Sequence, residues 1–199
     1  MDVTGVILAG GKSRRYGKNK ALVKINGITL IEKTAGVMRS IFQQIIIITN
    51  TPDRYAYLKL PMYEDLIKDL GPLGGIHTAL SAISSDQGFI VACDMPSLNR
   101  GLIRYMLDKR NGFDIVLPRV SDKVEPLHAF YSKRCLPAIN KLIDSKIYQV
   151  NRFFPDVSIL YIEEDKIREF DPDLKSFLNI NRPQEADNYK KGIYEVNNI

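Results

Sequence analysis

The sequence lacks the features that mark several large classes of protein. Its 199 residues contain no apolar run long enough to cross a membrane, so no transmembrane segment is expected. The N-terminal residues Met-Asp-Val-Thr show neither the basic segment nor the cleavage site of a secretory leader. The two cysteines, Cys93 and Cys135, do not have metal-site spacing and are expected to be small core or helix-start residues. Together these absences predict a cytoplasmic protein.

Two common phosphate-binding motifs and one catalytic arrangement are also absent. The sequence contains neither G-x-x-x-x-G-K-[ST] nor G-x-G-x-x-G. It has two histidines, His77 and His128, and no Ser-His-Asp spacing. Each histidine is more typical of a packed core or rim position than of a catalytic acid or base. The sequence thus disfavours a P-loop enzyme, a dinucleotide-binding Rossmann enzyme and a serine hydrolase.

The charge balance is basic, with 28 Lys and Arg against 23 Asp and Glu, for a formal net charge of +5. Such an excess can indicate nucleic-acid binding. The basic residues are spread along the chain apart from one loop, however, and no segment combines aromatic and basic residues as RNA-binding motifs do. An anionic small-molecule substrate explains the charge equally well. We therefore expect no nucleic acid and no membrane among the partners.

The most informative stretch covers residues 6–20, V-I-L-A-G-G-K-S-R-R-Y-G-K-N-K. Its apolar start predicts a short strand that is buried on both faces. The chain then turns at Gly10 and Gly11, where the missing Cβ atoms permit positive φ and close approach of backbone N–H groups to a ligand. Five cations follow, namely Lys12, Arg14, Arg15, Lys18 and Lys20. This combination is typical of a polyphosphate cradle, although an ordinary turn before a solvated surface would have the same pattern.

The rest of the chain alternates between strand and helix patterns. Strands are predicted at 6–8, 45–48, 62–63, 88–93, 114–120, 126–132, 157–162 and 177–181, and helices at 30–42, 53–60, 76–83, 99–109, 137–143 and 184–191. A tight turn is predicted at Asn26-Gly27. The alternation indicates an α/β fold in which helices cover both faces of a mostly parallel sheet. Without a repeat, a low-complexity tract or a linker, residues 1–199 are expected to form a single domain with a frayed tail at about 193–199.

Polar residues follow three of the predicted strands, at the edge where open α/β sheets bind ligands. They are the Gly10-Gly11 loop, Asn50 and Asp94. Asp94 directly follows the hydrophobic run 89–93, so its carboxylate should be held at the rim of the sheet, where it can bind Mg²⁺ that bridges phosphate oxygens. The alternative is that Asp94 only caps the turn before Pro96.

The first loop, read as L-A-G-G-x-S-x-R-x-G-x-x-K, resembles the signature loop of nucleotidyltransferases, and among them that of the molybdenum cofactor guanylyltransferases. The matching residues are Leu8, Ala9, Gly10, Gly11, Ser13, Arg15, Gly17 and Lys20. Tyr16 departs from the family, which often has Met at this position.

Further motifs that resemble those of the family follow in the same order. Residues Glu64-Asp65, with the turn at 71–76, resemble its central motif, and Cys93-Asp94-Met95-Pro96 matches its C-D-x-P motif. Asn179-Ile180-Asn181-Arg182-Pro183 resembles its N-x-N-x-P element. The resemblance therefore extends over most of the chain.

The resemblance implies a three-layer α/β/α Rossmann-like nucleotidyltransferase fold and a specific reaction. Such enzymes transfer GMP from GTP to molybdenum-molybdopterin, release pyrophosphate and form the molybdopterin guanine dinucleotide cofactor. Phosphoryl-type transfer requires positioning and charge neutralisation rather than covalent catalysis by the protein. Apart from GTP and the acceptor, other cofactor-biosynthesis proteins or apo-molybdoenzymes are candidate partners.

The resemblance also assigns roles to residues of this chain. Leu8, Ala9, Gly10, Gly11, Lys20, Asp65 and Asp94 would bind the nucleotide. Arg15, Lys20 and Asp94 would act in catalysis, with Asp94 as the ligand of Mg²⁺, while Asn179 and Asn181 would lie on the pterin side. Asp69 is a second candidate for the role of Asp65.

Several alternatives stay open. A nucleotidyltransferase of the same fold could use another base or acceptor, such as the cytosine form of the molybdenum cofactor, a sugar 1-phosphate or a polyol phosphate. The L-A-G-G start and the G-P-L-G-G segment are more similar to the guanine-specific branch, and Asn19-Lys20 lacks the Pro-Lys pair of many sugar-phosphate relatives. A non-catalytic nucleotide-binding module is a third interpretation. Arg119 and Glu125 flank a polar loop that either contacts the acceptor or is a plain surface hairpin.

Overall fold

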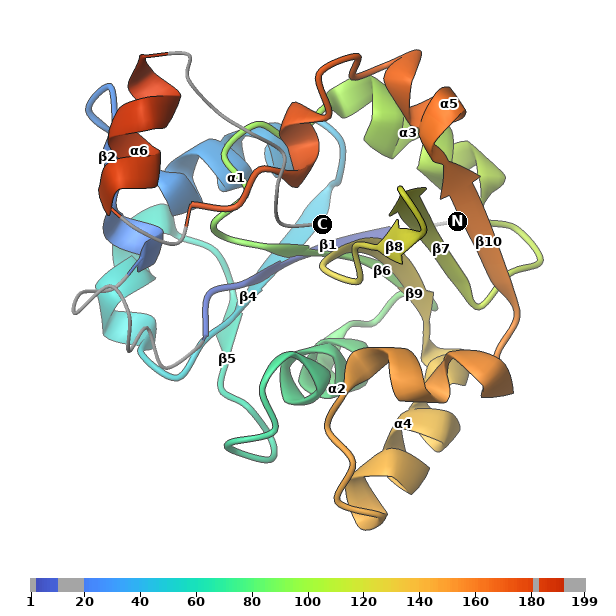
Figure 1. Cartoon of the computed structure of the whole chain (residues 1–199). Helices are drawn as coiled ribbons and strands as arrows, with labels where there is room; N and C mark the ends of the chain where they lie inside the picture. Colours follow the sequence, from blue (N-terminus) through green and yellow to red (C-terminus); the bar gives the residue numbers. More distant parts are fainter. Residues whose placement is uncertain (1–2, 11–19, 181–182, 192–199) are drawn as a thin grey trace.

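The computed structural model of the chain describes residues 3–10, 20–180 and 183–191. At its centre lies an eight-stranded sheet in the order β10-β7-β9-β6-β1-β4-β5, with β8 paired to β7 (Figure 1). The strands of this sheet are β1 (Val3–Leu8), β4 (Gln44–Ile48), β5 (Met62–Tyr63), β6 (Gln87–Ala92), β7 (Ile115–Val120), β8 (Lys123–Val124), β9 (His128–Ser132) and β10 (Ile159–Glu163). A separate hairpin consists of β2 (Lys24–Ile25) and β3 (Ile28–Thr29).

Helices cover both faces of the sheet. The α-helices are α1 (Leu30–Arg39), α2 (Pro72–Ala82), α3 (Arg100–Lys109), α4 (Leu136–Asp144), α5 (Glu164–Arg168) and α6 (Pro183–Lys190). Short 3₁₀ helices are η1 (Lys20–Leu22), η2 (Pro52–Leu58), η3 (Lys133–Cys135), η4 (Val150–Asp156) and η5 (Lys175–Phe177). In Figure 1, α2 and α4 lie below the sheet, and α1 and α3 lie above it. The predicted α/β class with helices on both faces is confirmed.

The sheet is parallel at its centre and antiparallel at two strands, β9 and the short β8, which pairs antiparallel with β7. β1 pairs in parallel with β4 and β6, β4 pairs in parallel with β5, and β10 pairs in parallel with β7. β9 runs antiparallel to both of its neighbours, β6 and β7. The start of β9 therefore lies at the edge of the sheet where the parallel strands end.

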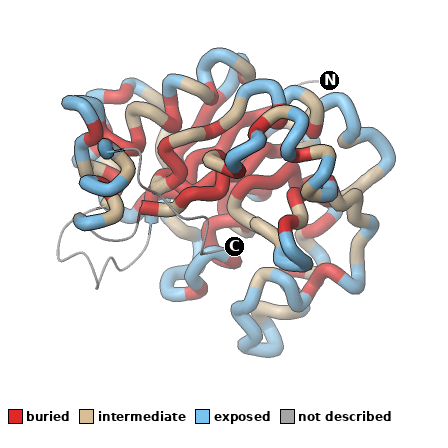
Figure 2. The backbone as a smooth tube through the Cα atoms, turned by 45° about the horizontal axis from the view of Figure 1, so that its top comes forward, coloured by how far each residue is buried: buried red, intermediate tan, exposed pale blue. Residues whose placement is uncertain are grey.

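Alternate residues of the buried strands face two separate hydrophobic layers. In β1, Ile7 belongs to the layer under α1 and α3, whereas Val6 and Leu8 belong to the layer over α2 and α4. This arrangement follows from the two-residue period of a strand and explains why the central strands are predominantly apolar. Figure 2 shows the consequence, because the buried backbone is concentrated in the strands and the exposed backbone in the surrounding segments. Both cysteines are free and buried, as the sequence predicts.

The hairpin of β2 and β3 has the turn that its sequence predicts. Asn26 and Gly27 have φ angles of 53° and 82°, and two positive φ angles are what a two-residue type I′ turn requires. The hairpin leads into α1, whose N-terminus is capped by Thr29 and Glu32 in a capping box. Ile25 and Leu30 pack with Ile180 and with Ala186 of α6 in a small separate core.

Two details of the predicted elements are wrong. The segment at 71–76 is not a turn throughout, because α2 begins at Pro72 and includes Gly74 and Gly75. The missing side chain at Gly75 lets the helix approach the sheet, since a Cβ there would lie 3.2 Å from Leu8 Cδ1. The strand predicted at 177–181 is also wrong, because residues 177–180, which the structure describes, do not form a strand. In its place, the Asp171 carboxylate accepts hydrogen bonds from Lys175 N and Ser176 N at 3.0 and 2.7 Å and holds the chain in η5.

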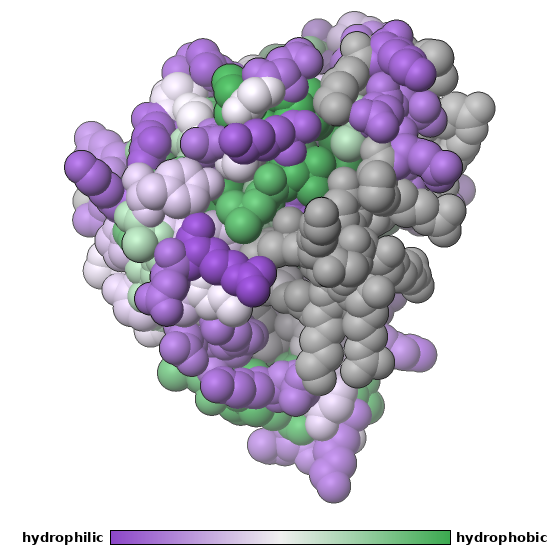
Figure 3. Space-filling model, turned by 90° about the vertical axis from the view of Figure 1, so that its left-hand side faces the viewer, coloured by the Kyte–Doolittle hydropathy of each residue, from purple (hydrophilic) through white to green (hydrophobic). Residues whose placement is uncertain are grey.

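The surface agrees with the charged composition. On the face shown in Figure 3, hydrophilic side chains predominate and hydrophobic ones gather in smaller groups. Within the described ranges, no helix is both long and apolar enough to cross a membrane.

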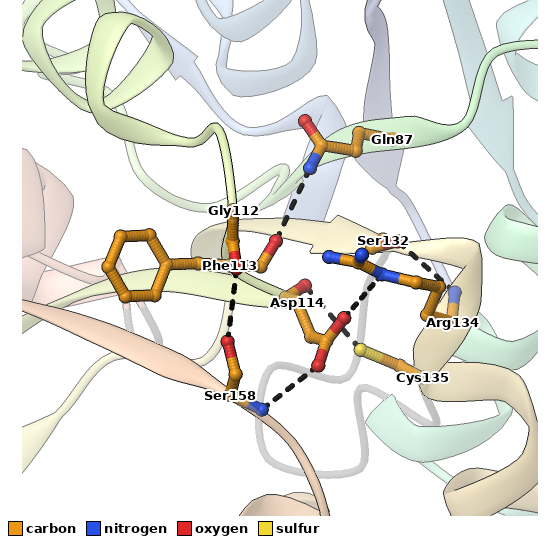
Figure 4. Close-up of polar contacts among 8 residues, drawn as sticks. All are labelled: Gln87, Gly112, Phe113, Asp114, Ser132, Arg134, Cys135 and Ser158. Atoms are coloured by element: carbon orange, nitrogen blue, oxygen red, sulfur yellow. Dashed lines mark hydrogen bonds and ion pairs between the residues drawn. The ribbon is translucent and has the colours of Figure 1, made fainter.

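A network of polar contacts joins three strands at the amino end of β7 (Figure 4). Asp114 pairs with Arg134 Nε at 2.6 Å and accepts a hydrogen bond from Ser158 N at 2.9 Å. Its backbone carbonyl accepts a bond of 2.7 Å from Ser132 N. This end of the sheet is opposite the carboxyl ends of the parallel strands, so the network supports the fold rather than the ligand-binding edge.

Replacing Asp114 should therefore destabilise the protein without changing its chemistry. Asp114→Ala removes the acceptor of Ser158 N–H from a side chain that is 17% exposed, and we expect the free energy of unfolding to fall by about 1–3 kcal/mol. Arg134→Ala is the matched control, because the Arg134 side chain is 64% exposed and such ion pairs contribute about 0–1 kcal/mol. Urea unfolding and turnover would be measured on both variants. An Asp114→Ala variant as stable as the control, or one with altered turnover at full stability, would contradict this role.

His128 lies in the core rather than at a catalytic position. Its side chain is fully buried, and its ring lies edge-on to Phe89 and at a steep angle to Phe177, with centroid distances of 5.2 and 5.3 Å. Neither ring nitrogen has a hydrogen-bond partner among the described residues. Burial lowers the pKa of His128 to about 3, because a charged imidazole cannot be solvated there.

This burial makes acid pH unfavourable for the folded state. The unfolded chain binds a proton at His128 below about pH 6.5, whereas the folded chain binds it only near pH 3, so stability from this residue falls as the pH drops through that interval. His128→Phe removes the titrating group and preserves an aromatic ring. Between pH 7 and pH 4.5 the variant should lose about 2–3 kcal/mol less of its free energy of unfolding than the wild type. Denaturant unfolding at the two pH values tests this, and equal losses in both proteins would refute it.

Candidate active site

Three strands end together at the centre of the sheet edge. Ala9 N donates a hydrogen bond to Ile48 O at 2.9 Å, and Cys93 N donates one to Leu8 O at 3.1 Å. Thr49 Oγ1 donates to Ala9 O at 3.2 Å. These bonds bring the ends of β4, β1 and β6 side by side, and with them three segments that the sequence singles out, namely 8–10, Asn50 and Asp94.

Lys20 and Asp94 form the central contact of this edge. Lys20 Nζ lies 2.5 Å from Asp94 Oδ2, and the two side chains are 23% and 13% exposed. Lys20 is the first residue of η1, whereas Asp94 follows β6, so the ion pair joins segments 74 residues apart. The structure thus places together two residues to which the resemblance assigns one site.

The second oxygen of Asp94 has no hydrogen-bond partner among the described residues. Oδ1 is buried, and no group within the described residues donates a hydrogen bond to it. A buried carboxylate oxygen without a partner is costly unless a ligand completes it. No group of three or more His, Cys, Asp and Glu residues in the described part of the chain could hold a metal. An ion bound through one carboxylate and substrate phosphates needs no such group, and this is a common arrangement for Mg²⁺.

Asp65 lies at the ends of β4 and β5 and pairs with Asn50. Asn50 Nδ2 donates to Asp65 Oδ2 at 2.7 Å, and Asp65 N donates to Asn50 Oδ1 at 3.1 Å. The sequence points to both residues separately, but their reciprocal pairing emerges only from the fold. The carboxylate of Asp65 is thereby fixed in orientation at the side of the site formed by β1, β4 and β5.

The C-terminal segment also contacts Asp94. Ile180 N donates a hydrogen bond to Asp94 O at 3.0 Å. Upstream, Ser176 Oγ donates to Ser97 O at 3.3 Å and accepts from Asn99 N at 3.0 Å. These contacts hold Asn179 beside the turn that carries Asp94.

Glu125 is the residue whose importance the sequence leaves open. It lies in the turn between β8 and β9, is only partly exposed, and its Oε1 accepts a hydrogen bond from Leu127 N at 3.1 Å. Burial raises the pKa of Glu125 to about 7, and the nearby Asp94 carboxylate acts in the same direction, while hydrogen bonds from Leu127 N and the Asn179 side chain partly oppose the rise. Glu125 therefore lies close to Asp94 and Asn179 rather than on a plain surface hairpin.

Arg119, which flanks the same polar loop as Glu125, contacts β10 instead of the residues around Asp94. Its guanidinium pairs with the Glu163 carboxylate at 2.5 Å and lies 4.6 Å from the centre of the Tyr161 ring. Both of these partners belong to β10. Arg119 therefore supports the pairing of β7 with β10.

Some of the predicted site residues cannot be placed. Gly11, Arg15 and Asn181 lie outside the described residues. Leu8 and Ala9 lie at the end of β1, where both are almost fully buried, and Gly10 is exposed directly after them. The described members of the predicted site therefore extend along one edge, from Asp65 through 8–10 to Asp94 and Asn179.

Comparisons with known proteins show the family and the fold of the chain. A family model for the MobA-like NTP transferase domain matches residues 5–156. A probable molybdenum cofactor guanylyltransferase of Pelotomaculum thermopropionicum is 37% identical over 93% of this chain and 90% of its own length. A molybdenum cofactor guanylyltransferase of Desulfosudis oleivorans is 35% identical over 96% of both chains. The crystal structure of molybdopterin-guanine dinucleotide biosynthesis protein A from Archaeoglobus fulgidus superposes with a TM-score of 0.82, at 26% identity over 95% of this chain and 97% of that one.

The geometry at Asp94 leads to a mutational prediction. Asp94→Asn keeps the shape of the side chain but removes its negative charge, which pairs with Lys20 through Oδ2 and is available to a cation through Oδ1. We therefore expect nucleotidyl transfer to fall about 10²-fold or more. The melting temperature should change little. The measurement is turnover together with thermal unfolding.

Asp173→Asn provides the matched control, since Asp173 is an aspartate whose side chain is 63% exposed and pairs with Lys175. It should keep full activity. If Asp94→Asn stays active but melts clearly earlier, Asp94 is a turn cap and not a catalytic residue.

Proposed function

This chain belongs to the MobA-like NTP transferase family, and on that premise we propose that it is a molybdenum cofactor guanylyltransferase. It transfers GMP from GTP to the phosphate of molybdenum-molybdopterin, releases pyrophosphate and forms the molybdopterin guanine dinucleotide cofactor. The observation that carries the proposal is the agreement between site and relatives. The Lys20–Asp94 pair occupies the centre of the ligand-binding edge, and relatives that bear this name match more than nine-tenths of the chain.

The nucleotide would occupy the half of the edge formed by β1, β4 and β5. The loop that follows Ala9 contributes Gly10, Gly11 and Arg15 to the triphosphate, and Lys20 offsets its negative charge. Asp65, oriented by Asn50, is a hydrogen-bond acceptor that suits the hydroxyl groups of the ribose.

Asp94 would lie at the α-phosphate. Its unpartnered oxygen fits a divalent cation, for which Mg²⁺ is our choice because carboxylate and phosphate oxygens are its usual ligands. Bound there, the ion supplies positive charge to the phosphate oxygens on which negative charge accumulates. Lys20, paired with the other oxygen, restricts the orientation of the carboxylate.

The reaction needs no strong general base. An oxygen of the acceptor phosphate forms the new bond to the α-phosphorus, and the bond between that phosphorus and the leaving pyrophosphate breaks. The acceptor phosphate is already ionised, so no proton must be removed before attack. This suits a site in which His128 is buried in the core away from any ligand.

Asn179 would lie on the acceptor side, because its side chain bonds to Glu125, which lies across β6 from the nucleotide motifs. Asn181, two residues later, is proposed for the same side from its place in the motif. GTP and molybdenum-molybdopterin are the proposed partners, whereas further cofactor-biosynthesis proteins and apo-molybdoenzymes stay candidates. A cytoplasmic location stays a prediction from the sequence.

One experiment separates this function from its alternatives. Pyrophosphate release would be measured with each of the four nucleoside triphosphates, with and without purified molybdopterin and with Mg²⁺ present or chelated. We expect release from GTP only, dependent on both the pterin and the metal. Release from CTP would identify a cytidylyltransferase, and release that needs a sugar or polyol phosphate in place of the pterin would overturn the proposed acceptor.

A pair of lysine variants provides the internal control. Lys20→Ala should weaken GTP binding and reduce turnover, because it removes the cation next to Asp94. Lys24→Ala changes an exposed lysine only four residues away and should leave both unchanged. Equal behaviour of the two variants would remove Lys20 from the site.

A further inference from the structure

The order of the strands divides the candidate site into two halves. The nucleotide motifs follow β1, β4 and β5, which lie on one side of β6. Asp94 follows β6 and marks the boundary. β9 lies on the other side of β6, so groups at the start of β9 face Asp94 from the side that the nucleotide motifs leave open.

Glu125 is the acidic residue at that position. Because β9 is antiparallel to β6, the turn before β9 lies at the same edge as Asp94. Ala92 N donates a hydrogen bond to Leu127 O at 3.1 Å. Because Ala92 is two residues before Asp94 in the sequence, this bond holds the turn close to Asp94. Leu127 N in turn donates to Glu125 Oε1 at 3.1 Å, so the carboxylate is oriented by the strand that positions the catalytic end of β6.

The surroundings of Glu125 differ from those of the other glutamates near this edge. Glu163 pairs with Arg119 and Glu164 pairs with Arg168, at 2.5 and 2.7 Å. No lysine or arginine within the described residues forms such a pair with Glu125; its partners are the Leu127 N–H and the Asn179 side chain. A carboxylate accepts about four hydrogen bonds, so Glu125 retains acceptor capacity in a partly buried position.

We propose that Glu125 binds the acceptor substrate by accepting a hydrogen bond from an N–H group of its pterin, and that it thereby contributes to the choice of acceptor. The proposal rests on the proposed function. In an in-line transfer the attacking and leaving oxygens lie on opposite sides of the α-phosphorus, so the acceptor enters from the half of the edge where Glu125 and Asn179 lie.

The chemistry of the acceptor fits this placement. Pterins carry ring N–H and amino groups, which are donors, and a carboxylate is a charged acceptor of such bonds. A negative side chain also repels acceptor substrates that would place only anionic groups next to it. Glu125 would therefore exclude such acceptors as well as bind the pterin. Asn179 can donate to an oxygen of the same ligand or hold Glu125 in place.

The test measures acceptor binding directly and does not depend on turnover. Molybdopterin would be titrated into the enzyme in the presence of Mg²⁺ and a GTP analogue that cannot be transferred, with pterin fluorescence as the signal. The titration would be made at about pH 8.5, where a carboxyl with a pKa of about 7 is ionised. Glu125→Gln preserves the size of the side chain and an oxygen for Leu127 N–H but removes the charge. We expect the dissociation constant of molybdopterin to rise about tenfold or more, the usual effect of losing a hydrogen bond to a charged group.

Two further measurements and two further variants control this result. The affinity for GTP with Mg²⁺, followed by calorimetry, should stay within about twofold of the wild type, and the melting temperature should be unchanged. Glu163→Gln is the matched control, because the same substitution at an exposed glutamate of β10 should leave molybdopterin binding unaffected. Glu125→Asp keeps the charge on a side chain that is shorter by one methylene group. It should weaken acceptor binding less than Glu125→Gln does.

The outcomes separate this inference from the proposed function. If the wild type binds molybdopterin and Glu125→Gln binds it equally well, the role of Glu125 is refuted while the proposed function stands. A parallel loss of GTP affinity would place Glu125 on the nucleotide or metal side and refute it as well. If the wild type does not bind molybdopterin at all, the proposed function fails and the role of Glu125 fails with it.

Discussion

The pairing of β1 between β4 and β6 is the constraint on which the rest of the site depends. Parallel strands in register end at the same edge, and here the register places Leu8 opposite Ile48 on one side and Ala92 on the other. The first loop, Asn50 and Asp94 follow these three residues and are therefore neighbours, although the chain separates them widely. Because all three strands are buried on both faces, a slip of the register would expose apolar side chains, so the hydrophobic core itself fixes the relative positions of the polar groups.

The reversed direction of β9 adds the second half of the site. A parallel strand beside β6 would bring its carboxyl end to this edge and its preceding turn to the far edge. The antiparallel pairing of β9 with β6 instead brings the turn before His128 next to Asp94. The same strand then buries His128 directly below, among phenylalanine rings, so one short segment supplies both a polar group at the edge and an aromatic core beneath it.

The sequence predicts the parts of the structure whose signals are local. The apolar strands, the Asn26-Gly27 turn and the positions of Gly10 and Asp94 at strand ends all follow from residue type and spacing. What the sequence does not contain is the direction of β9, because a short apolar run has the same pattern in either orientation. For this reason Glu125 could be read equally well as part of a surface hairpin. The strand predicted at 177–181 fails because the N–H groups of its described residues bond elsewhere. Phe177 N and Leu178 N donate to the local carbonyls of Leu174 and Lys175, and Ile180 N donates to Asp94 O.

The charges at the edge also explain why a basic protein needs several acidic residues at its proposed site. The Asp94 carboxylate lies close enough to Glu125 to help raise its pKa, and Lys20 forms an ion pair with Asp94. A nucleoside triphosphate adds further negative charge, which these carboxylates would repel in the absence of cations. The proposed roles separate these charges along the edge: the cations of the first loop would bind the triphosphate, Asp94 would bind a metal ion, and Glu125 would bind a ligand that offers N–H donors. A site built for one anionic ligand alone would have no use for Glu125, so this carboxylate is the feature that argues for two chemically different substrates.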